Sequence, residues 1–317
     1  MANNSNPGGV CAVIVTYNRL NLLKKCLEGV RSQTRPPDRI VVVNNASTDG
    51  TTEWLSSVPG VNVLNQANSG SSGGQGAGFC WARDHGCAWI WCCDDDVRPK
   101  PDALARMLDV GTRHQACILT LKQFDDGAVQ QLKNYFCPLT AKRLNRPPVM
   151  VEPGVESVNF GNFEGMLIPR RVVDAIGIPD RRFFVCGDDI IYGFLASRTG
   201  PVLLHREPLF DKLVPRPPAK PKWKGPRLRM TDFQVYFFSR NRWLCLKILK
   251  EAGTLKPGAY LQYFKVSLQE AIYILLFDKS KIKRLELLAS GFIDALQNRW
   301  GGGRLIPSAL VSGTQPA

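Results

Sequence analysis

The sequence predicts an α/β fold with a doubly wound sheet, and three features of its first part lead to that prediction. Residues 11–16 and 39–43 are continuous apolar runs, as in strands that are buried on both faces of a parallel sheet. Between them, residues 18–30 repeat apolar side chains at helical spacing. A short helix and a third strand at residues 61–64 complete a β-α-β-α-β rhythm, which is typical of a doubly wound sheet.

The rest of the chain continues this alternation and then becomes helical. Residues 122–158 are too irregular to assign to elements. The elements expected around them are a helix opened by the Gly-rich segment 68–79, a strand at 89–93, a helix at 102–112, a strand at 116–121, a strand at 163–168, helices at 170–176 and 188–199, and longer helices at 231–250, 259–277 and 282–300.

Composition limits the class of protein. The chain has 317 residues, 44% of them hydrophobic, which is enough to bury a core in one large or two modest domains. We expect no signal peptide, because residues 1–9 are polar, and no spanning helix, because no apolar run reaches about 18 residues. The 10 cysteines show neither paired CxxC spacing nor a Cys/His cluster. We therefore expect a cytoplasmic protein without disulfides or structural zinc.

The basic charge is concentrated in the second half of the chain. A net charge of +14 fits a nucleic acid, an anionic membrane surface or a phosphorylated ligand. Residues 212–229 hold seven basic residues, five prolines and no acid, as in either a solvated linker or a loop that meets diphosphate or lipid head groups. An apolar stripe at 260–276, with basic neighbours at 279–284, indicates core, a subunit contact or a membrane-docking helix. Residues 301–317 are expected to fray.

Polar side chains stand at the carboxyl ends of three predicted strands. Thr16 to Asn18 follow the first strand, Asn44 to Asp49 the second, and Asp94 to Asp96 the strand at 89–93. In doubly wound sheets the ligand binds beyond the carboxyl ends of the strands. Three polar clusters at one edge therefore predict a binding site there.

The triplet Asp94, Asp95 and Asp96 is the strongest of these signals. It ends the apolar run Trp89 to Cys93. Three adjacent carboxylates repel one another, and hard divalent cations such as Mg²⁺ or Mn²⁺ take oxygen ligands and keep substrate phosphate in their shell. The alternative is an acidic, solvated loop, which is seldom preceded by so apolar a run. The triplet predicts a site for a metal and a diphosphate.

The Gly-rich segment is a weaker signal. A turn of this kind at a helix start offers backbone N–H groups to an anion. Gly74, Gly76 and Phe79 match a dinucleotide fingerprint only in part, since Phe79 stands where the last glycine belongs and the segment does not follow the first strand. A Rossmann dehydrogenase is therefore disfavoured.

A second pair of carboxylates, Asp188 and Asp189, opens the helix at 188–199. One of them could simply cap the helix N-terminus, where a carboxylate is stabilised. Capping does not require both, and paired aspartates are a common source of general bases.

Together these motifs resemble, in type and order, those of the inverting family 2 glycosyltransferases of GT-A fold. The likeness spans about residues 10–245. The Gly-rich segment followed by an aspartate triplet is most similar to the bacterial galactofuranosyltransferase branch, with rhamnosyltransferases nearby. The matching segments are 13–19, 43–51, 68–79, 91–101, 187–193 and 236–241.

The resemblance implies an architecture. It would be a GT-A type doubly wound mixed sheet, with a Rossmann-like nucleotide half and an acceptor half, followed by a C-terminal helical region. The implied segments are a catalytic domain at 1–210 (nucleotide half 10–121, acceptor half 122–210), a basic Pro-rich loop at 211–230, the helical region at 231–300 and the tail at 301–317.

The resemblance also implies roles for matching residues. Asp189, or less readily Asp188, would take the proton from the acceptor hydroxyl in a single inverting displacement. Asp94 and Asp96 would hold Mn²⁺ or Mg²⁺, which neutralises charge on the departing diphosphate. The residues that would bind the nucleotide sugar are Thr16, Asn18, Arg19, Asn45, Asp49, Asn68, Gly74, Asp94 and Asp95.

The chain departs from the family pattern at three places. Asn44 stands where many relatives carry Asp, and Ile191 replaces a common acidic residue. Galactofuranosyl relatives also carry a histidine that completes the metal shell. Here His205, Asp211 or water would substitute, and we take His205 as the candidate ligand.

The leading hypothesis is the transfer of a hexose, galactofuranose from its uridine diphosphate, to a saccharide acceptor of bacterial surface polysaccharide or cell-wall glycan. The alternatives are a rhamnosyltransferase that uses a dTDP-sugar, a nucleotidyltransferase, and a basic nucleic-acid-binding module. The expected partners are the UDP-linked donor, a saccharide acceptor that includes lipid-linked forms, and an anionic membrane surface on the inner face of the cell membrane. No nucleic acid partner is expected, and a homo-oligomer stays open.

Overall fold

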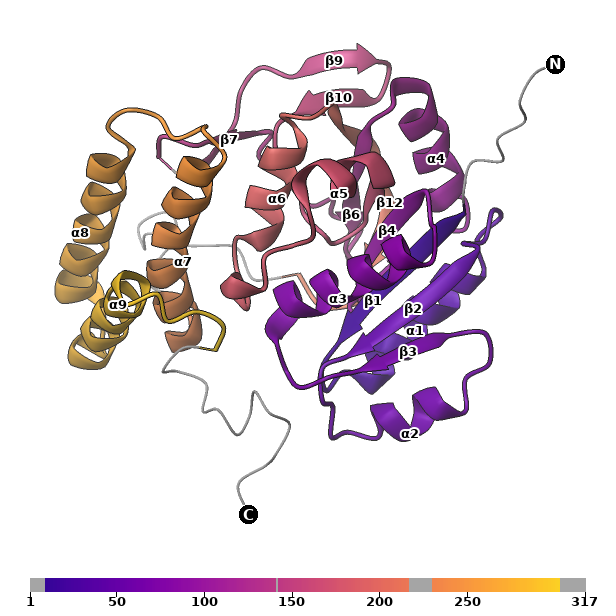
Figure 1. Ribbon diagram of the computed structural model, residues 1–317, viewed down its shortest axis with the longest axis horizontal. Coiled ribbons are helices and arrows are strands. Elements are labelled where there is room, and N and C mark those ends of the chain that lie inside the picture. The colour runs from indigo at the N-terminus through magenta and orange to yellow at the C-terminus, as the bar shows by residue number, and fades with distance from the viewer. Residues whose placement is uncertain (1–8, 141, 217–229, 303–317) are drawn as a thin grey trace.

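A computed structural model describes residues 9–140, 142–216 and 230–302 of the protein (Figure 1). Most of the predicted basic loop and of the predicted tail, at 217–229 and 303–317, lies outside these residues. The described strands are β1 (Val10–Thr16), β2 (Arg39–Asn44), β3 (Asn62–Asn65), β4 (Trp89–Asp94), β5 (Val97–Pro99), β6 (Cys117–Gln123), β7 (Tyr135–Cys137), β8 (Lys142–Leu144), β9 (Val149–Glu152), β10 (Val155–Val158), β11 (Met166–Pro169) and β12 (Val202–Lys212). The described helices are α1 (Leu20–Arg31), α2 (Thr51–Ser56), α3 (Gly70–Asp84), α4 (Ala103–His114), α5 (Arg170–Ile176), the 3₁₀ turn Arg181–Phe183, α6 (Asp188–Ala196), α7 (Asp232–Glu251), α8 (Ala259–Phe277) and α9 (Lys281–Leu296).

One large mixed sheet organises the molecule. Its strand order is β3-β2-β1-β4-β11-β6-β12-β10-β9, and β5 pairs with β12. The first four strands of this order run parallel, whereas β11 is antiparallel to both β4 and β6. The doubly wound mixed sheet expected from the sequence is therefore present.

Helices cover both faces of this sheet because its inner strands are apolar on both sides. Ala12 and Ile14 of β1 pack with α1 and α4, while Cys11 and Val13 pack with α3, α5 and α6. Alternate side chains of a strand point to opposite faces, so a continuous apolar run supplies two cores at once. The result is a three-layer arrangement whose carboxyl edge collects the loops after β1, β2 and β4 (Figure 1).

The acceptor half contains strands that the sequence did not predict. Residues 122–158, which we left unassigned, form the hairpin of β7 and β8 and the edge strands β9 and β10. The longest strand, β12, was also not predicted, and it extends two residues past the expected domain end at 210, to Lys212. It pairs with β6 in parallel and with β5 and β10 antiparallel, so it joins the two halves.

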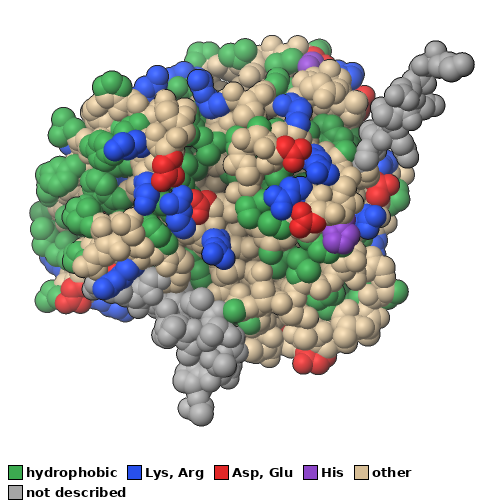
Figure 2. All heavy atoms as spheres, in the orientation of Figure 1, with side chains coloured by type: hydrophobic (Ala, Val, Ile, Leu, Met, Phe, Trp, Pro, Cys, Tyr) green, Lys and Arg blue, Asp and Glu red, His purple; other side chains and the backbone are tan. Residues whose placement is uncertain are grey.

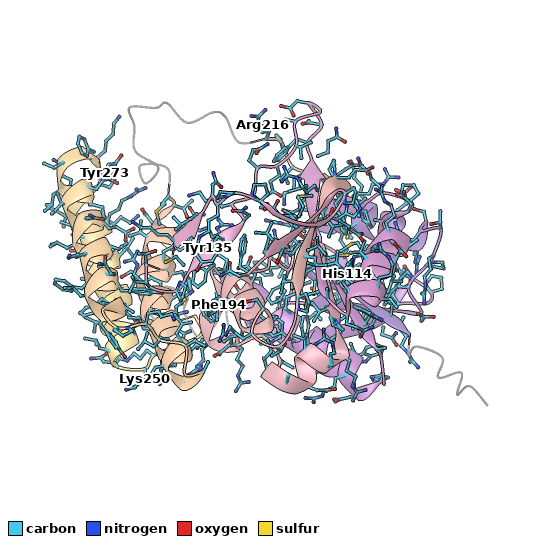
Figure 3. All side chains as sticks on the ribbon, turned by 90° about the horizontal axis from the view of Figure 1, so that it is seen from above. His114, Tyr135, Phe194, Arg216, Lys250 and Tyr273 are labelled. Carbon is cyan, nitrogen blue, oxygen red and sulfur yellow. The ribbon has the colours of Figure 1, made fainter. Side chains whose placement is uncertain are left out.

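Three helices form the C-terminal region, close to the ranges predicted. Thr231 caps α7 through a reciprocal pair of hydrogen bonds with Gln234. Residues of α6, α7 and α8 share one apolar cluster that includes Phe194, Leu249 and Tyr263. In Figures 1 and 3, α7 lies between α6 and α8, and α8 forms the outer edge of the molecule. Among the described residues, no helix combines the length and hydropathy that a bilayer crossing requires.

Candidate active site

A cleft of about 660 Å³ lies over the carboxyl ends of β1 and β4. Phe184, Val185 and Phe233 line it from the acceptor half and α7, so segments far apart in the sequence meet there. This volume lies in the range of small-molecule sites. The polar residues that line it are Thr16, Arg19, Asn45, Asn68, Ser71, Asp94, Asp95 and Asp96.

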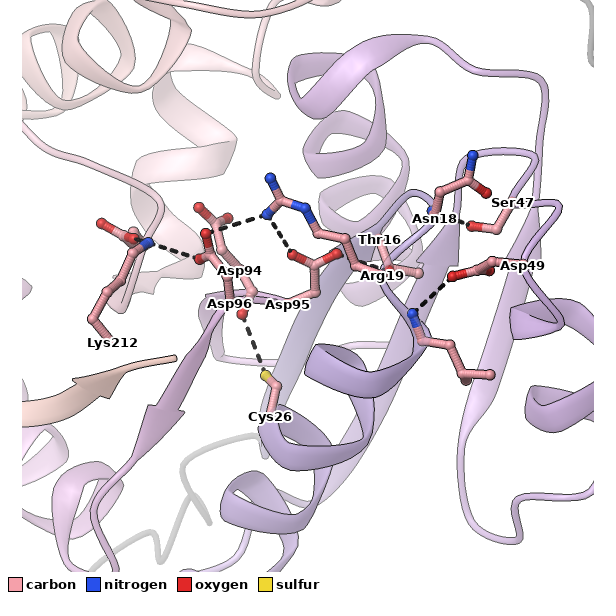
Figure 4. A network of polar contacts seen from close by, with 12 residues as sticks. Thr16, Asn18, Arg19, Cys26, Ser47, Asp49, Asp94, Asp95, Asp96 and Lys212 are labelled. Atoms are coloured by element: carbon pink, nitrogen blue, oxygen red, sulfur yellow. Dashed lines mark hydrogen bonds and ion pairs between the residues drawn. The ribbon is translucent and has the colours of Figure 1, made fainter. Parts of the chain in front are cut away.

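Asp95 is held in place from β1. Its Oδ2 accepts a hydrogen bond from the Thr16 hydroxyl at 2.8 Å, and its Oδ1 accepts one from Arg19 Nη1 at 3.1 Å (Figure 4). Burial raises the pKa of Asp95, against the opposing charge of Arg19. The same guanidinium lies 3.2 Å from Asp96 Oδ2, so one arginine bridges two carboxylates of the triplet.

Asp94 and Asp96 form a potential metal site with a third carboxylate, Glu164. Ligand oxygens of these residues lie within 4.8 Å of one another. Burial raises the pKa of Asp94 well above its usual range, and the charges of Glu164 and Asp96 add to the effect. Carboxylates crowded in this way are stabilised by a cation, and an all-oxygen set suits Mg²⁺ or Mn²⁺.

Glu164 was missed by sequence reasoning, although the strand register explains its position. β11 is antiparallel to β4, with Met166 opposite Cys92, and the Gly165 N–H donates to the Cys92 carbonyl at 3.0 Å. Continuing this register by two residues places Glu164 beside Asp94. The turn before β11 therefore delivers a carboxylate to the end of β4, and an antiparallel assignment of β11 would have revealed it.

Two lysines surround this carboxylate group. Lys212 Nζ lies 2.8 Å from Asp96 Oδ1 and also bonds Glu164, while the fully buried Lys122 lies 3.3 Å from the other Glu164 oxygen. Burial opposes ionisation of Glu164, but the two lysines outweigh it and lower the pKa of this carboxyl. Glu164 is thus held as an anion beside Asp94.

His205, our candidate metal ligand, lies elsewhere. Its Nε2 is 3.4 Å from Arg106 Nη2 and its Nδ1 is 3.3 Å from the Glu207 carbonyl. Burial lowers the pKa of His205. The described carboxylate group contains Glu164 and neither His205 nor Asp211.

Several other predicted donor residues shape the cleft instead of lining it. Asn18 Oδ1 accepts from the Thr48 N–H at 2.7 Å, and Asp49 Oδ2 accepts from the Leu20 N–H at 2.9 Å. Both contacts fasten the loop after β2 to the start of α1 (Figure 4 labels Asn18 and Asp49). Asn44, which departs from the family pattern, is buried and bonded to Thr52 and Asn65 side chains.

The Gly-rich segment lets α3 approach the sheet closely. A Cβ on Gly74 would lie 2.4 Å from Val15 Cγ1, and one on Gly78 would lie 2.2 Å from Val13 Cγ1. Gly74 therefore contributes packing, whereas Asn68 and the first residues of α3 reach the cleft. Asn45 joins the two, because its Nδ2 donates to the Gly70 carbonyl at 3.1 Å.

Asp188 and Asp189 begin α6 after Gly187, which adopts a left-handed conformation with φ of 96°. Burial, reinforced by Asp189, raises the pKa of Asp188 to about 8. Burial also raises the pKa of Asp189, whose charged neighbours include Arg143, Glu164 and Lys122.

The two carboxyls face different surroundings. Asp188 lines a pocket with Arg181 and Phe183 on the far side of α6. The charges of Glu164 and of its partner Lys122 act on Asp189. Of the two carboxyls, Asp189 is therefore the one electrostatically linked to the carboxylate group of the cleft.

Comparison with known proteins finds a family match in the first half of the chain. Residues 11–159 match the model of glycosyl transferase family 2. The chain is 31% identical to galactofuranosyltransferase GlfT1 of Mycolicibacterium smegmatis over 194 residues, which cover 57% of this chain and 63% of the relative. GlfT1 of Mycobacterium tuberculosis strain H37Rv is 29% identical over 193 residues, covering 57% of this chain and 62% of the relative. Each alignment thus spans less than two thirds of the relative.

Solved structures agree on the fold. TarS of S. aureus in complex with UDP-GlcNAc has a TM-score of 0.53 at 12% identity, covering 95% of this chain and 77% of that chain. GalNAc-T7 with UDP, GalNAc and Mn²⁺ has a TM-score of 0.51 at 15% identity, covering 75% of this chain and 51% of that chain. The GT-A type architecture expected from the sequence is confirmed.

Proposed function

We propose, from the match of residues 11–159 to glycosyl transferase family 2, that the protein is a metal-dependent inverting glycosyltransferase that moves a hexose from a UDP-linked donor to a saccharide acceptor. The observation that carries the proposal is the meeting of Asp94, Asp96 and Glu164 beside the cleft over β1 and β4. An acidic, solvated loop would not be wrapped by Lys122, Lys212 and Arg19.

The residues present fit a divalent cation. Asp94, Asp96 and Glu164 supply only oxygen, which is the ligand set of Mg²⁺ and Mn²⁺. The raised pKa of Asp94 reflects its burial first and then repulsion from Glu164 and Asp96, which a cation relieves. When bound, such a cation neutralises charge on the departing diphosphate. Arg19 and Lys212 add positive charge at the same place.

The nucleotide of the donor would bind to the residues that line the cleft. Thr16 and Arg19 fix Asp95, while Asn45 and Asn68 line the cleft from the loops after β2 and β3. The similarity to two GlfT1 proteins favours galactofuranose as the sugar. The alternative in the same class is rhamnose carried by dTDP.

Asp189 is our candidate general base. It would take the proton of the attacking acceptor hydroxyl while that oxygen bonds to the anomeric carbon and the bond to the diphosphate breaks on the opposite face. One displacement of this kind inverts the configuration. The raised pKa of Asp189 lowers the ionised fraction at acidic pH but makes the carboxylate a stronger base.

We propose a glycan of the bacterial surface or cell wall as the acceptor, in a form that includes lipid-linked intermediates. The similarity to an undecaprenyl-phosphate mannosyltransferase of Micrococcus luteus, at 32% identity over 105 residues, supports this choice. All 10 cysteines are unpaired, and this supports a reducing compartment such as the cytoplasm as the proposed location of the protein.

A donor screen tests this proposal. We expect UDP release from UDP-galactofuranose in the presence of Mn²⁺ or Mg²⁺, and little from UDP-glucose or UDP-GlcNAc. Faster release of dTDP from dTDP-rhamnose would transfer the proposal to the alternative sugar. No release from any nucleotide sugar, with or without oligosaccharide acceptors, would contradict the proposed function.

A further inference from the structure

The outward face of α8 is apolar along most of its length. We call it the α8 outer face. Figure 2 shows hydrophobic side chains gathered at the end of the molecule where Figure 1 places α8. The residues of this face, each at least 46% exposed, are Tyr260, Leu261, Phe264, Leu268, Ile272, Leu275 and Leu276. They recur at helical spacing over about 25 Å of helix.

The rotation of α8 that exposes this face is fixed by polar contacts on its inner side. Glu270 is 3% exposed, and its Oε2 lies 2.7 Å from Arg242 of α7. The same arginine donates to the Ser267 hydroxyl at 2.7 Å, and the Tyr263 ring is fully buried beneath the helix. Turning the apolar face inward would break a buried charge pair, which is strongly unfavourable.

Cations flank the α8 outer face. Exposed lysines lie before the helix (Lys256), within it (Lys265) and directly after it (Lys279 and Lys281). None of the four forms an ion pair with another residue in the described part of the chain. The neighbouring acid Asp278 is buried and paired with Arg284, so it does not offset their charge.

We propose that the α8 outer face docks on the surface of an anionic lipid bilayer, with the helix lying along the surface. An apolar stripe bordered by lysines is the chemistry of an interfacial helix, because the apolar side chains enter the head-group boundary while the ammonium groups reach lipid phosphates. Ile282, which is 76% exposed, extends the apolar surface past the end of α8.

A second copy of this chain fits the face less well. Pairing two α8 outer faces would bring Lys265 and its flanking lysines of both copies together, and the acid within α8, Glu270, is buried and paired with Arg242, in a chain whose net charge is +14. Like charges at an interface oppose association, whereas anionic head groups complement them.

Vesicle binding tests the proposal independently of catalysis. The full chain is floated with vesicles of phosphatidylcholine alone or with phosphatidylglycerol added, at low and at physiological salt. We expect binding only to the anionic vesicles, weaker at higher salt. The triple variant Phe264→Gln, Leu268→Gln, Ile272→Gln should bind roughly a hundredfold more weakly, because each side chain removes apolar burial. The double variant Lys279→Glu, Lys281→Glu should lose roughly tenfold.

Matched controls distinguish binding through the α8 outer face from non-specific binding to vesicles. Val149→Gln with Val151→Gln changes exposed apolar residues on β9, and Lys25→Glu reverses an exposed charge on α1. Both should keep wild-type vesicle binding, and every variant should keep its thermal unfolding midpoint and its binding of UDP.

Two outcomes would overturn the proposal. One is binding that is equal for wild type and the triple variant, or absent from both. The other is a wild-type chain that ignores vesicles but sediments as a dimer, with the triple variant a monomer; the α8 outer face would then join two copies.

Discussion

Two groups of carboxylates are built in opposite ways: one joins the end of β4 to the turn before β11, and the other opens α6. Asp94, Asp96 and Glu164 are surrounded by cations, since Arg19, Lys122 and Lys212 all make ion pairs with this part of the site. Asp188 and Asp189 make no ion pair with any residue that the structure describes, and burial raises the pKa of both. We propose that the first group binds positive charge and that the second accepts a proton. Donor and acceptor chemistry would then belong to separate elements.

A substitution in the second group should change activity most. Asp189→Asn should lower kcat by about 10²–10⁴-fold, because it removes the proposed base. Its binding of UDP with Mn²⁺ should stay within about twofold of wild type, since the first group is untouched. Steady-state kinetics and calorimetry measure the two quantities.

Asp188→Asn is the control for that variant. It has the same change of charge one residue away, and it should retain most of the kcat. If the two variants lost activity equally, or Asp189→Asn abolished UDP binding, the separation of the two groups would be wrong.

The next effect concerns the first group. Glu164→Gln should weaken Mn²⁺ binding about tenfold, because it removes one of three anionic oxygens beside the cation while keeping the size of the side chain. Electron paramagnetic resonance counts free Mn²⁺ directly. Glu207→Gln, which removes an exposed partner of Arg106, should leave Mn²⁺ binding unchanged.

Equal Mn²⁺ affinity in wild type and Glu164→Gln would show that Glu164 is not the third ligand, which would then be another residue or water. A thermal melt of each variant shows whether the loss of the lysine contacts of Glu164 has unfolded the site.

The smallest effect is on stability. The pKa of Asp188, about 8 in the folded protein, lies above that of an unfolded Asp, about 4. The folded state therefore binds an extra proton between these values, and its free energy of unfolding falls as the pH rises through this window. Asp188→Asn removes the titration. It should stabilise the protein by roughly 1 kcal/mol or more at about pH 9, with less benefit at about pH 5.

Thermal unfolding at the two pH values measures this benefit. A variant that is less stable than wild type at alkaline pH would show that Asp188 is stabilised as an anion, and the contrast between the two groups would fail.

The nucleotide half was predicted well from the sequence because its elements are local. The runs that became β1 and β2 are apolar on both faces, and α1 begins four residues after β1 ends. Each element can therefore be predicted from a short stretch of sequence. The carboxyl edge of parallel strands then follows from topology, and this is why Thr16 and the Asp94 to Asp96 triplet could be brought together in advance.

The acceptor half depends on pairing between strands that are far apart in the sequence, and a short stretch of sequence does not reveal such pairing. β12 starts with apolar residues but then carries His205, Arg206, Glu207 and Pro208, and its register against β6 shifts on both sides of Pro208. A proline inside a polar run argues against a strand, whereas here the irregularity accommodates it. Glu164 was missed for a related reason, since its place depends on β11 running antiparallel to β4.

We propose that the cleft over β1 and β4 binds a nucleoside diphosphate through a cation held by the carboxylate group. Calorimetric titration of UDP, with and without Mn²⁺, tests it on wild type, Asp96→Ala and Asp174→Ala, an exposed carboxylate of α5 that serves as control. We predict binding that requires Mn²⁺, is lost in Asp96→Ala and is kept in Asp174→Ala. UDP binding that is indifferent both to Mn²⁺ and to Asp96 would contradict the claim.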